Sequence, residues 1–237
     1  MTRRRWIADE YSHSADTAVL IGEHAAHLAR TLRARVGQEF EIACGDRVRS
    51  GVISSIADDR VEFSLGGDVA AGTAVPITLL LAVFKFDRME WAIEKCTELN
   101  VATIVPVVAR RTEKHLAAAA DKRVERWRRI AREASEQSRR VSPPEIADPV
   151  KLADSLHCDA VLRIVLAESE SKTSLADVLN SHNQAQSLAL AIGPEGGWTA
   201  EELQGFQQAQ WISASLGSTI LRAETAAIAA LAIARGC

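Results

Sequence analysis

The feature that most constrains the fold is a set of uninterrupted apolar runs after Pro76. They read ITLLLAVFK, VATIVPVVA, DAVLRIVLAE and SLALAIG, at residues 77–85, 101–109, 159–168 and 187–193. Continuous apolar runs are typical of strands that are buried on both faces of a parallel sheet. Helical patterns lie between these runs, so residues 76–237 are predicted to form an α/β domain with a mostly parallel sheet.

The pattern between the first two runs predicts a helix over residues 87–100. Met89, Ile93 and Cys96 recur at helical spacing. Asp87 is the expected N-cap, and Asn100 is expected to adopt the left-handed conformation that ends a helix. Other helices are predicted at residues 116–140, near residue 175, directly after residue 199, and at residues 223–235.

The N-terminal part of the chain has a different pattern of apolar and polar residues. It contains short segments in which apolar residues either alternate with polar ones or follow one another, and Gly-containing turns separate these segments. They read EFEIACG, RVRSGVISSIA and RVEFSL. One helix, GEHAAHLARTLRARVG, is predicted among them and is expected to end at Gly37. Residues 1–72 are therefore predicted to form a small β-barrel, with the domain boundary near residues 72–76.

Composition limits the class of protein. The 237-residue chain carries a formal net charge of −3, and its four cysteines are far apart without metal-ligand spacing. Free thiols in a reducing compartment and no metal site are expected. No apolar segment follows the basic N-terminus, and no run approaches the ~20 residues of a membrane helix. We expect a cytoplasmic protein with no membrane partner.

The stretch IGPEGGWTAEE places a proline and three glycines between an apolar run and a helix. Thr199 and Glu202 have the spacing of a capping box, so the helix is expected to begin directly after the glycines. The loop then lies at the carboxyl end of a parallel strand, where open α/β sheets bind ligands. It matches neither a dinucleotide fingerprint nor a P-loop. The alternative is an unusually tight turn.

A second glycine-containing loop, in SLGSTILRAETAAIAAL, follows the short strand WISA and enters an Ala-rich helix. Glu224 near that helix start is favoured by the helix dipole, whereas Arg222 there requires an anion or a carboxylate. A surface pair between Arg222 and Glu224 is the structural alternative. The alanines predict close packing against the sheet or against a second subunit.

Together these motifs resemble the RsmE family of ribosomal RNA uridine-N3 methyltransferases, within the SPOUT or α/β-knot superfamily. The resemblance also includes KFDRMEWAIEKCTELNVATIVPV, RWRRIAREASEQSRR, RRRWIA and GEHAAHLARTLRARVG, and it covers nearly the whole chain. The combination of ordered motifs makes the resemblance specific.

The resemblance implies a trefoil knot in the C-terminal domain, a PUA-like RNA-binding barrel at the N-terminus, and a homodimer packed through the knot helices. It implies S-adenosylmethionine (SAM) as the cofactor and 16S rRNA, within the assembled small ribosomal subunit, as the partner. By motif match, the cofactor-binding residues are Leu190, Ile192, Gly193, Pro194, Glu195, Gly196, Leu216, Gly217, Ile220, Leu221 and Arg222.

Methylation at uracil N3 requires loss of a proton and stabilisation of the anion that forms. The catalytic candidates beside the expected cofactor are Arg222, Glu195 and Glu224, with Arg222 as the best transition-state stabiliser. N3 lies on the pairing edge of the base, so the target must be unpaired or extruded. The expected RNA-binding residues are Arg3, Arg4, Arg5, Arg33, Arg35, Lys85, Arg88, Arg111, Gln137 and Arg140.

The chain departs from the family at one place. Family members commonly have Pro-Arg where this chain has Ser218-Thr219, so a cation is missing at Thr219. Two other functions are therefore kept beside the favoured one. One is a knotted methyltransferase that acts on a ribose 2′-hydroxyl or on transfer RNA, and the other is an RNA-binding protein that has lost catalysis.

Overall fold

The computed structural model describes residues 5–57, 59–70 and 76–236. The chain divides into two compact units. Unit 1 comprises Met1–Ala74 with Arg132–Pro143, and unit 2 comprises Val75–Ala131 with Pro144–Cys237. Residues 71–75 lie outside the described part, so the predicted boundary near residues 72–76 stays a prediction.

Unit 2 is built on a seven-stranded sheet in which every pairing is parallel, as the apolar runs predicted. The strand order is β10-β8-β7-β12-β11-β13, with β9 pairing separately to β8. The strands are β7 (Ile77–Ala82), β8 (Thr103–Val108), β9 (Glu145–Ile146), β10 (Val150–Lys151), β11 (Leu162–Leu166), β12 (Leu188–Ile192) and β13 (Ile212–Ala214).

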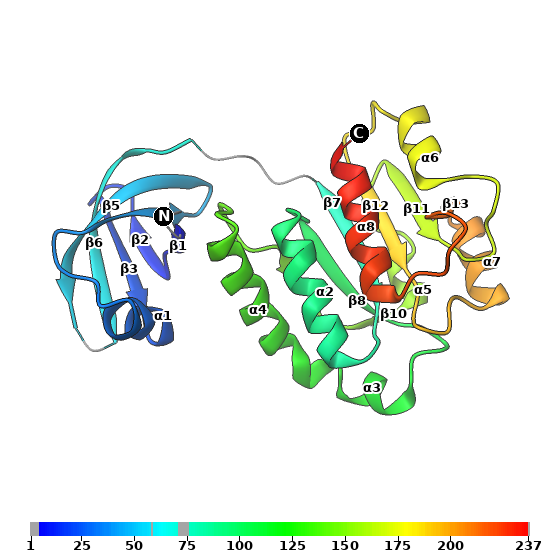
Figure 1. The fold of residues 1–237 in the computed structure, drawn as a ribbon, viewed down its shortest axis with the longest axis horizontal. Helices are drawn as coiled ribbons and strands as arrows, with labels where there is room; N and C mark the ends of the chain where they lie inside the picture. Colours follow the sequence, from blue (N-terminus) through cyan, green and yellow to red (C-terminus); the bar gives the residue numbers. More distant parts are fainter. Residues whose placement is uncertain (1–4, 58, 71–75, 237) are drawn as a thin grey trace. The chain divides into compact units, whose positions relative to one another are not determined.

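Helices connect the strands and cover both faces of this sheet (Figure 1). They are α2 (Phe86–Glu98), α3 (Lys114–Ala119), a 3-10 turn (Asp121–Arg123), α4 (Val124–Gln137), α5 (Leu152–Ser155), α6 (Leu175–Ser181), α7 (Ala200–Gln208) and α8 (Ala223–Gly236). No helix in the described part of the chain has both the length and the apolar character needed to cross a membrane.

The strands of unit 2 are apolar on both faces because each face has its own core. In β7, Leu79 and Leu81 point into a cluster with α2, α4, α6 and α8, whereas Leu80 and Ala82 point into a cluster with α5 and α7. In Figure 1, α2 and α8 lie side by side, and they pack on each other. A sheet covered in this way presents only its edges and strand ends to solvent, and ligands bind at the carboxyl ends.

Three details of the predicted helices need comment. The helix at residues 116–140 is instead divided into α3, a 3-10 turn and α4, although the backbone stays helical at Ala120 (φ −59°, ψ −45°). It ends at Gln137 because Arg139 adopts φ +61°. Asp87 is not the N-cap of α2: Lys85 occupies that position, and Asp87 lies in the first turn. Asn100 does adopt the left-handed conformation, at φ +64°.

Unit 1 contains a curled six-stranded sheet in the order β1-β4-β5-β6-β3-β2. Only β1 and β4 pair in parallel. Two irregularities in the β5–β6 register accompany the curling, since bulges increase local twist. The elements are β1 (Arg5–Ile7), β2 (Glu10–Ser12), β3 (Thr17–Ile21), α1 (Glu23–Ala26), a π-helical turn (His27–Thr31), β4 (Glu39–Cys44), β5 (Arg47–Ile56) and β6 (Arg60–Asp68).

The core of unit 1 includes Trp6, Leu20, Leu28 and Phe63, all fully buried. The helix predicted to reach Gly37 is shorter than expected. Its last helical residue is Thr31 and Leu32 is the C-cap, because the next residue, Arg33, adopts φ +52°, which a right-handed helix cannot contain. The helical spacing of apolar residues continues beyond this point, which is why the sequence pattern overestimated its length.

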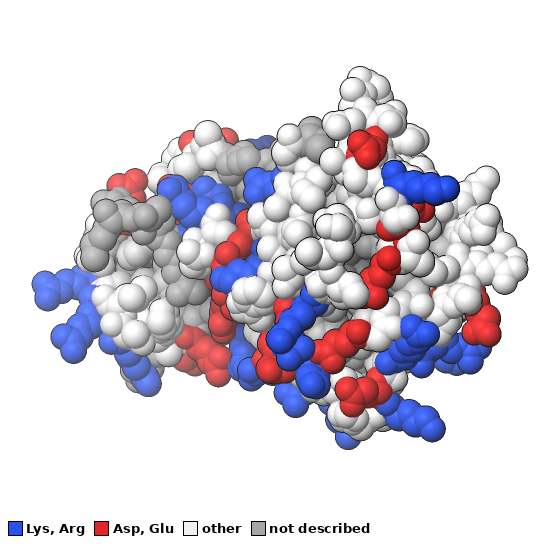
Figure 2. Space-filling view, turned by 45° about the vertical axis from the view of Figure 1, so that its right-hand side comes forward, with Lys and Arg blue, Asp and Glu red and all other residues white. Residues whose placement is uncertain are grey.

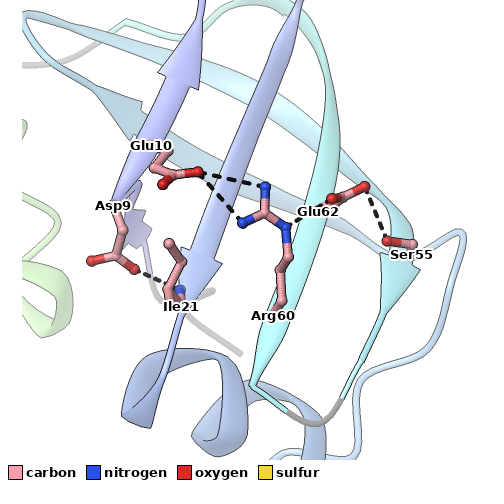
Figure 3. A network of polar contacts seen from close by, with 6 residues as sticks. All are labelled: Asp9, Glu10, Ile21, Ser55, Arg60 and Glu62. Atoms are coloured by element: carbon pink, nitrogen blue, oxygen red, sulfur yellow. Dashed lines mark hydrogen bonds and ion pairs between the residues drawn. The ribbon is translucent and has the colours of Figure 1, made fainter.

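The outer surface of this sheet carries a chain of polar contacts (Figure 3). Arg60 on β6 donates to Glu62 on the same strand at 2.9 Å and reaches Glu10 on β2 at 3.4 Å. Glu62 in turn accepts from Ser55 at 3.2 Å. These groups are largely exposed, so the network adds little stability but keeps the surface of the sheet polar.

A buried arginine joins the first strand of unit 1 to the segment that follows α4. Arg5 is 3 % exposed, donates to Glu41 on β4 at 2.8 and 3.1 Å, and also donates to the Arg139 carbonyl. Arg139 itself pairs with Glu41. Arg132 contributes an ion pair to Asp9 at 2.8 Å. The contacts explain why residues 132–143 belong to unit 1.

We expect Glu41→Gln to destabilise unit 1 at neutral pH by about 1–2 kcal/mol. Burial alone would raise the pKa of Glu41, but hydrogen bonds from Arg139 and Arg5 outweigh it and lower the pKa below 4.5. A carboxyl group whose pKa is lower in the folded than in the unfolded state stabilises the folded state at pH values above its unfolded-state pKa. This stabilisation is lost as the pH falls through the folded-state pKa. The difference between variant and wild type should therefore shrink below about pH 4.

Urea titrations at pH 7 and at acidic pH, followed by the NMR signal of the Trp6 indole, measure this difference. Glu39→Gln is the matched control, because Glu39 lies on the same strand, is exposed, and has no side-chain partner among the described residues. A destabilisation by Glu41→Gln that stays constant across the acid range would contradict the assignment.

Candidate functional site

The site of unit 2 is a cavity of about 410 Å³ at the carboxyl ends of β11, β12 and β13. Three loops surround it, one after each of these strands. The lining residues are Arg111, Leu166, Ala167, Glu168, Ser169, Glu170, Ile192, Gly193, Gly196, Gly197, Trp198, Ala200, Leu203, Ala214, Ser215, Leu216, Gly217, Ser218, Thr219, Ile220, Leu221, Ala223 and Ala226. The cavity lies where the strand order predicts a ligand site.

The loop after β12 is held by the start of α7. The predicted capping box is confirmed: Thr199 Oγ1 accepts from the Glu202 amide at 3.2 Å, and Glu202 Oε2 accepts from the Thr199 amide at 2.8 Å. The other oxygen of Glu202 accepts from the Arg110 amide at 2.7 Å. Glu202 is only 8 % exposed, so this carboxylate joins the β12 loop to the loop after β8.

Trp198 joins the same loop to the end of β11. Its indole Nε1 donates to the Leu166 carbonyl at 3.1 Å, and its ring packs edge-on against Phe206 with the centroids 4.9 Å apart. A Cβ on Gly193 would stand 3.2 Å from the indole nitrogen, which is tighter than ordinary packing allows. The glycine therefore permits the close approach of Trp198 to the strand end.

The remaining glycines of this loop face the side chain of Arg111. Its guanidinium donates to the Gly196 carbonyl, so one donor of this cation already has a partner. Gly197 adopts φ +68° and donates its amide to the Pro194 carbonyl at 2.8 Å. The positive φ explains why glycine is needed at position 197. The sequence pattern allowed this loop to be either a ligand site or a tight turn. In the structure it forms a turn and also lines the cavity.

The loop after β13 has an unusual backbone. Within the described residues, the peptide groups of residues 216–221 form no hydrogen bonds, although the whole segment lines the cavity. Gly217 adopts φ +119°, and the Ile220 side chain is 80 % exposed. Peptide groups of this kind are available to a ligand. Backbone donors and acceptors without partners suit the edge of a purine base.

The predicted cofactor residues fall into two groups. The structure brings seven of them together around the cavity: Ile192, Gly193, Gly196, Leu216, Gly217, Ile220 and Leu221. The other four, Leu190, Pro194, Glu195 and Arg222, are not among the lining residues. Leu190 is fully buried within β12 and belongs to the sheet core.

The predicted catalytic carboxylates meet at one arginine. Arg88 on α2 donates to Glu195 at 2.5 Å, and its Nε lies 3.8 Å from Glu224. Glu224 is 6 % exposed, and its Oε2 has no hydrogen-bond partner among the described residues. The alternative surface pair between Arg222 and Glu224 is not formed. Arg222 is exposed, and its guanidinium has no partner in the described part of the chain.

The predicted RNA-binding residues also differ in their availability. Arg3 and Arg4 lie outside the described residues. Four of the others already have intramolecular partners: Arg5, Arg88, Arg111 and Arg140. Four are exposed with no side-chain partner within the described residues: Arg33, Arg35, Lys85 and Gln137. On the face in Figure 2, basic and acidic side chains are interspersed, so this face carries no uniform basic patch.

The loop after β11 was not among the predicted parts of the site. Glu168, Ser169 and Glu170 line the cavity directly beyond the last residues of that strand. The signal was present, because a carboxylate placed immediately after a buried parallel strand lies at the ligand-binding edge. Trp198 was quoted within its motif, but nothing in the spacing indicated that it would close the cavity.

The lining chemistry fits S-adenosylmethionine. The walls are mostly apolar or glycine, and free peptide groups at residues 216–221 can pair with adenine. A carboxylate, Glu168, is present for polar or cationic groups of the molecule. Small-molecule sites combine mostly apolar walls with a few polar groups in this way.

The chain is similar to known RNA methyltransferases over most of its length. A family model described as an RNA methyltransferase domain matches residues 72–235. The chain is 30 % identical to the ribosomal RNA small subunit methyltransferase E of Bacillus subtilis, over 92 % of this chain and 89 % of that protein. It is also 30 % identical to the protein of the same name from Rickettsia conorii, over 91 % and 88 % of the two chains.

Two solved structures resemble the whole chain. One is a ribosomal RNA small subunit methyltransferase E from Neisseria gonorrhoeae bound to S-adenosyl methionine. It has a TM-score of 0.88, is 25 % identical, and the match covers 99 % of this chain and 97 % of that one. The other is described as a methyltransferase from Legionella pneumophila in complex with SAM. It has a TM-score of 0.88 and is 28 % identical, and the match covers 100 % of this chain and 98 % of that one.

Proposed function

Because the chain belongs to the RNA methyltransferase family, and within it to the ribosomal RNA small subunit methyltransferase E proteins, we propose that it methylates N3 of a uridine in 16S rRNA. The observation that carries the proposal is the cavity at the carboxyl ends of β11, β12 and β13. Its walls include most of the residues expected to bind SAM. SAM, when bound, supplies an electrophilic methyl group without any need for a metal.

The residues of the cavity would bind and orient the cofactor. Backbone groups of residues 216–221 are free for the adenine, and the β12 loop is rigid because Glu202 and Trp198 tie it to neighbouring loops. Rigid walls hold the methyl group in line with an incoming nucleophile, which is the main requirement of this substitution.

The residues proposed for chemistry lie beside these walls. Arg222 directly follows the cavity-lining Leu221, and its free guanidinium is suited to stabilise the charge that develops on uracil when N3 loses its proton. Glu195 and Glu224 are the candidates to accept that proton. They share Arg88 as a partner, and Glu224 has an oxygen that no described group occupies.

The oligomer, knot and cellular context complete the proposal. A homodimer packed through helices of unit 2 is supported by the Ala-rich α8 and by Trp91 on the adjacent α2, which is 46 % exposed. We propose a knotted chain path in this unit, a PUA-like role for unit 1, and a cytoplasmic location where ribosomal subunits assemble. Sedimentation at low concentration tests the dimer.

Transfer of labelled methyl groups from SAM tests the function directly. Assembled small subunits lacking the modification are compared with naked 16S rRNA, and the modified nucleoside is then identified by mass spectrometry. N3-methyluridine in the subunits supports the proposal in full. A ribose-methylated or transfer RNA product would support the alternative knotted methyltransferase. SAM binding without methyl transfer would favour the alternative of an RNA-binding protein that has lost catalysis. The missing cation at Thr219 is the reason for keeping this alternative.

Lys85 provides a separate test of RNA contact. It is exposed at the N-cap of α2, and its ammonium has no partner among the described residues. We expect Lys85→Ala to weaken RNA binding and to reduce the slope of log K against log salt by about 1, because one phosphate contact is lost. Fluorescence anisotropy with a 16S rRNA fragment at several salt concentrations measures the slope.

Lys151 on β10 is the matched control, since it is exposed and outside the predicted RNA-binding set. Equal slopes for Lys85→Ala and the wild type would remove Lys85 from the RNA interface.

A further inference from the structure

The loop after β11 contains a carboxylate that none of the interactions described above employs. Glu168 follows β11 by two residues and lines the cavity. It is exposed, and its side chain has no hydrogen-bond or ion-pair partner among the described residues. A solvated glutamate on an ordinary surface needs no explanation, but this one stands at the rim of the ligand cavity.

Its neighbour in the same loop has a different role. Glu170 also lines the cavity, but its Oε1 accepts from the amides of Lys172 at 2.7 Å and Thr173 at 3.1 Å. These backbone hydrogen bonds lower the pKa of Glu170 below 4.5. Glu170 therefore closes the loop, and Glu168 is the carboxylate left to meet a ligand.

The position of Glu168 relative to the glycine loop is specific. The point where a Cβ on Gly197 would stand is 3.8 Å from Glu168 Oε2 and 4.0 Å from Arg111 Nη1. A cation in this corner would face the Arg111 guanidinium as well as the carboxylate, so attraction and repulsion would largely offset each other. Neutral hydroxyl groups have no such repulsion, and a carboxylate can accept two of them at once.

We propose that Glu168 binds the ribose of the cofactor by accepting hydrogen bonds from its vicinal hydroxyls, and so positions the adenosine between the β11 and β12 loops. β11 and β12 are adjacent parallel strands, so the carboxylate lies beside the glycine loop at the same edge of the sheet. Dinucleotide-binding sheets also bind a ribose hydroxyl through an acidic side chain, near a glycine-rich loop. This inference rests on the proposed function, because it requires SAM in the cavity.

Calorimetry on the full-length protein tests the proposal with three ligands. SAM carries the adenosine, the sulfonium charge and the charged amino-acid part. 5′-Methylthioadenosine keeps the adenosine but has a neutral thioether and no amino-acid part, and 2′-deoxy-5′-methylthioadenosine also lacks one ribose hydroxyl. We expect Glu168→Gln to raise the Kd of SAM and of 5′-methylthioadenosine by the same factor, about tenfold to a hundredfold. The deoxy analogue should lose much less affinity on the same substitution.

Controls separate the ribose contact from general effects of charge and folding. Glu201→Gln removes an exposed carboxylate of α7 that does not line the cavity, and it should leave every Kd unchanged. Glu168→Gln keeps the shape of the side chain and breaks no internal hydrogen bond, so its thermal unfolding should match that of the wild type.

The possible outcomes distinguish this inference from the proposed function. A loss confined to SAM would place Glu168 opposite the sulfonium or the charged amino-acid part and would overturn the ribose assignment, as would unchanged affinity for all three ligands. If the wild-type protein binds SAM and shows the Glu168 effect but methylates no RNA, the ribose contact stands and the proposed function fails. If the wild type binds none of the ligands, both are wrong.

Discussion

Replacing Arg222 with alanine is expected to lower kcat for methyl transfer by about 10²–10³-fold, the usual effect of removing one charge-stabilising donor. The Kd for SAM should change little, because Arg222 does not line the cavity. The guanidinium has no partner in the described part of the chain, so its charge is available to the uracil anion. Labelled methyl transfer to small subunits, with calorimetry for SAM, measures both quantities.

Two variants sharpen this prediction. Arg222→Lys keeps the charge but loses the planar fork of donors, so it should recover only part of the activity. Arg235→Ala removes an exposed arginine from the last turn of α8 and should leave kcat unchanged. Normal turnover in Arg222→Ala would exclude a catalytic role, and an equal loss in Arg235→Ala would point to a general charge effect on RNA binding.

Replacing Trp198 with alanine is expected to destabilise unit 2 by about 3–5 kcal/mol, the range for truncating a buried aromatic residue. The ring is 8 % exposed and packs against Phe206. Its hydrogen bond to the Leu166 carbonyl also joins the loops after β11 and β12. SAM affinity should therefore fall at least tenfold even where the variant is fully folded, because the two walls of the cavity are no longer held together.

Trp198→Phe separates packing from hydrogen bonding. It keeps most of the apolar surface but leaves the Leu166 carbonyl without its donor, at a cost of about 1–3 kcal/mol. Tyr11→Ala, at an exposed aromatic residue of unit 1, is the control for SAM affinity. Urea unfolding and calorimetry are the measurements. If Trp198→Ala binds SAM as tightly as the wild type, the indole does not hold the cavity closed.

Local signals predicted much of the fold. The apolar runs predicted strands buried on both faces, and the cores on the two sides of β7 explain why the runs are continuous. The capping box at Thr199 and the left-handed Asn100 were predicted because each depends on residues within a few positions along the chain. In such cases the residues that cause the local structure lie close together in the sequence.

Signals that depend on distant contacts were harder to interpret. Helical spacing continues past Leu32 and past Gln137, yet both helices end where Arg33 and Arg139 take positive φ. In the second case, the segment after the helix is held by Glu41, 98 residues away in the chain. Asp87 has a good N-cap side chain but lies inside the first turn of α2. The spacing of apolar residues shows which face of a helix is apolar, but it does not show at which residue the helix ends.

The sequence by itself determined the family, the parallel sheet, and the two glycine-containing loops at its ligand-binding edge, because these follow from ordered motifs and short-range spacing. Only the tertiary structure decided which residues meet there. It placed Glu168 at the cavity, tied Trp198 to the end of β11, and paired Glu224 with Arg88 rather than with Arg222. The physical reason is that parallel strands bring together strand ends that are far apart in the chain, and no local pattern records which side chains become neighbours.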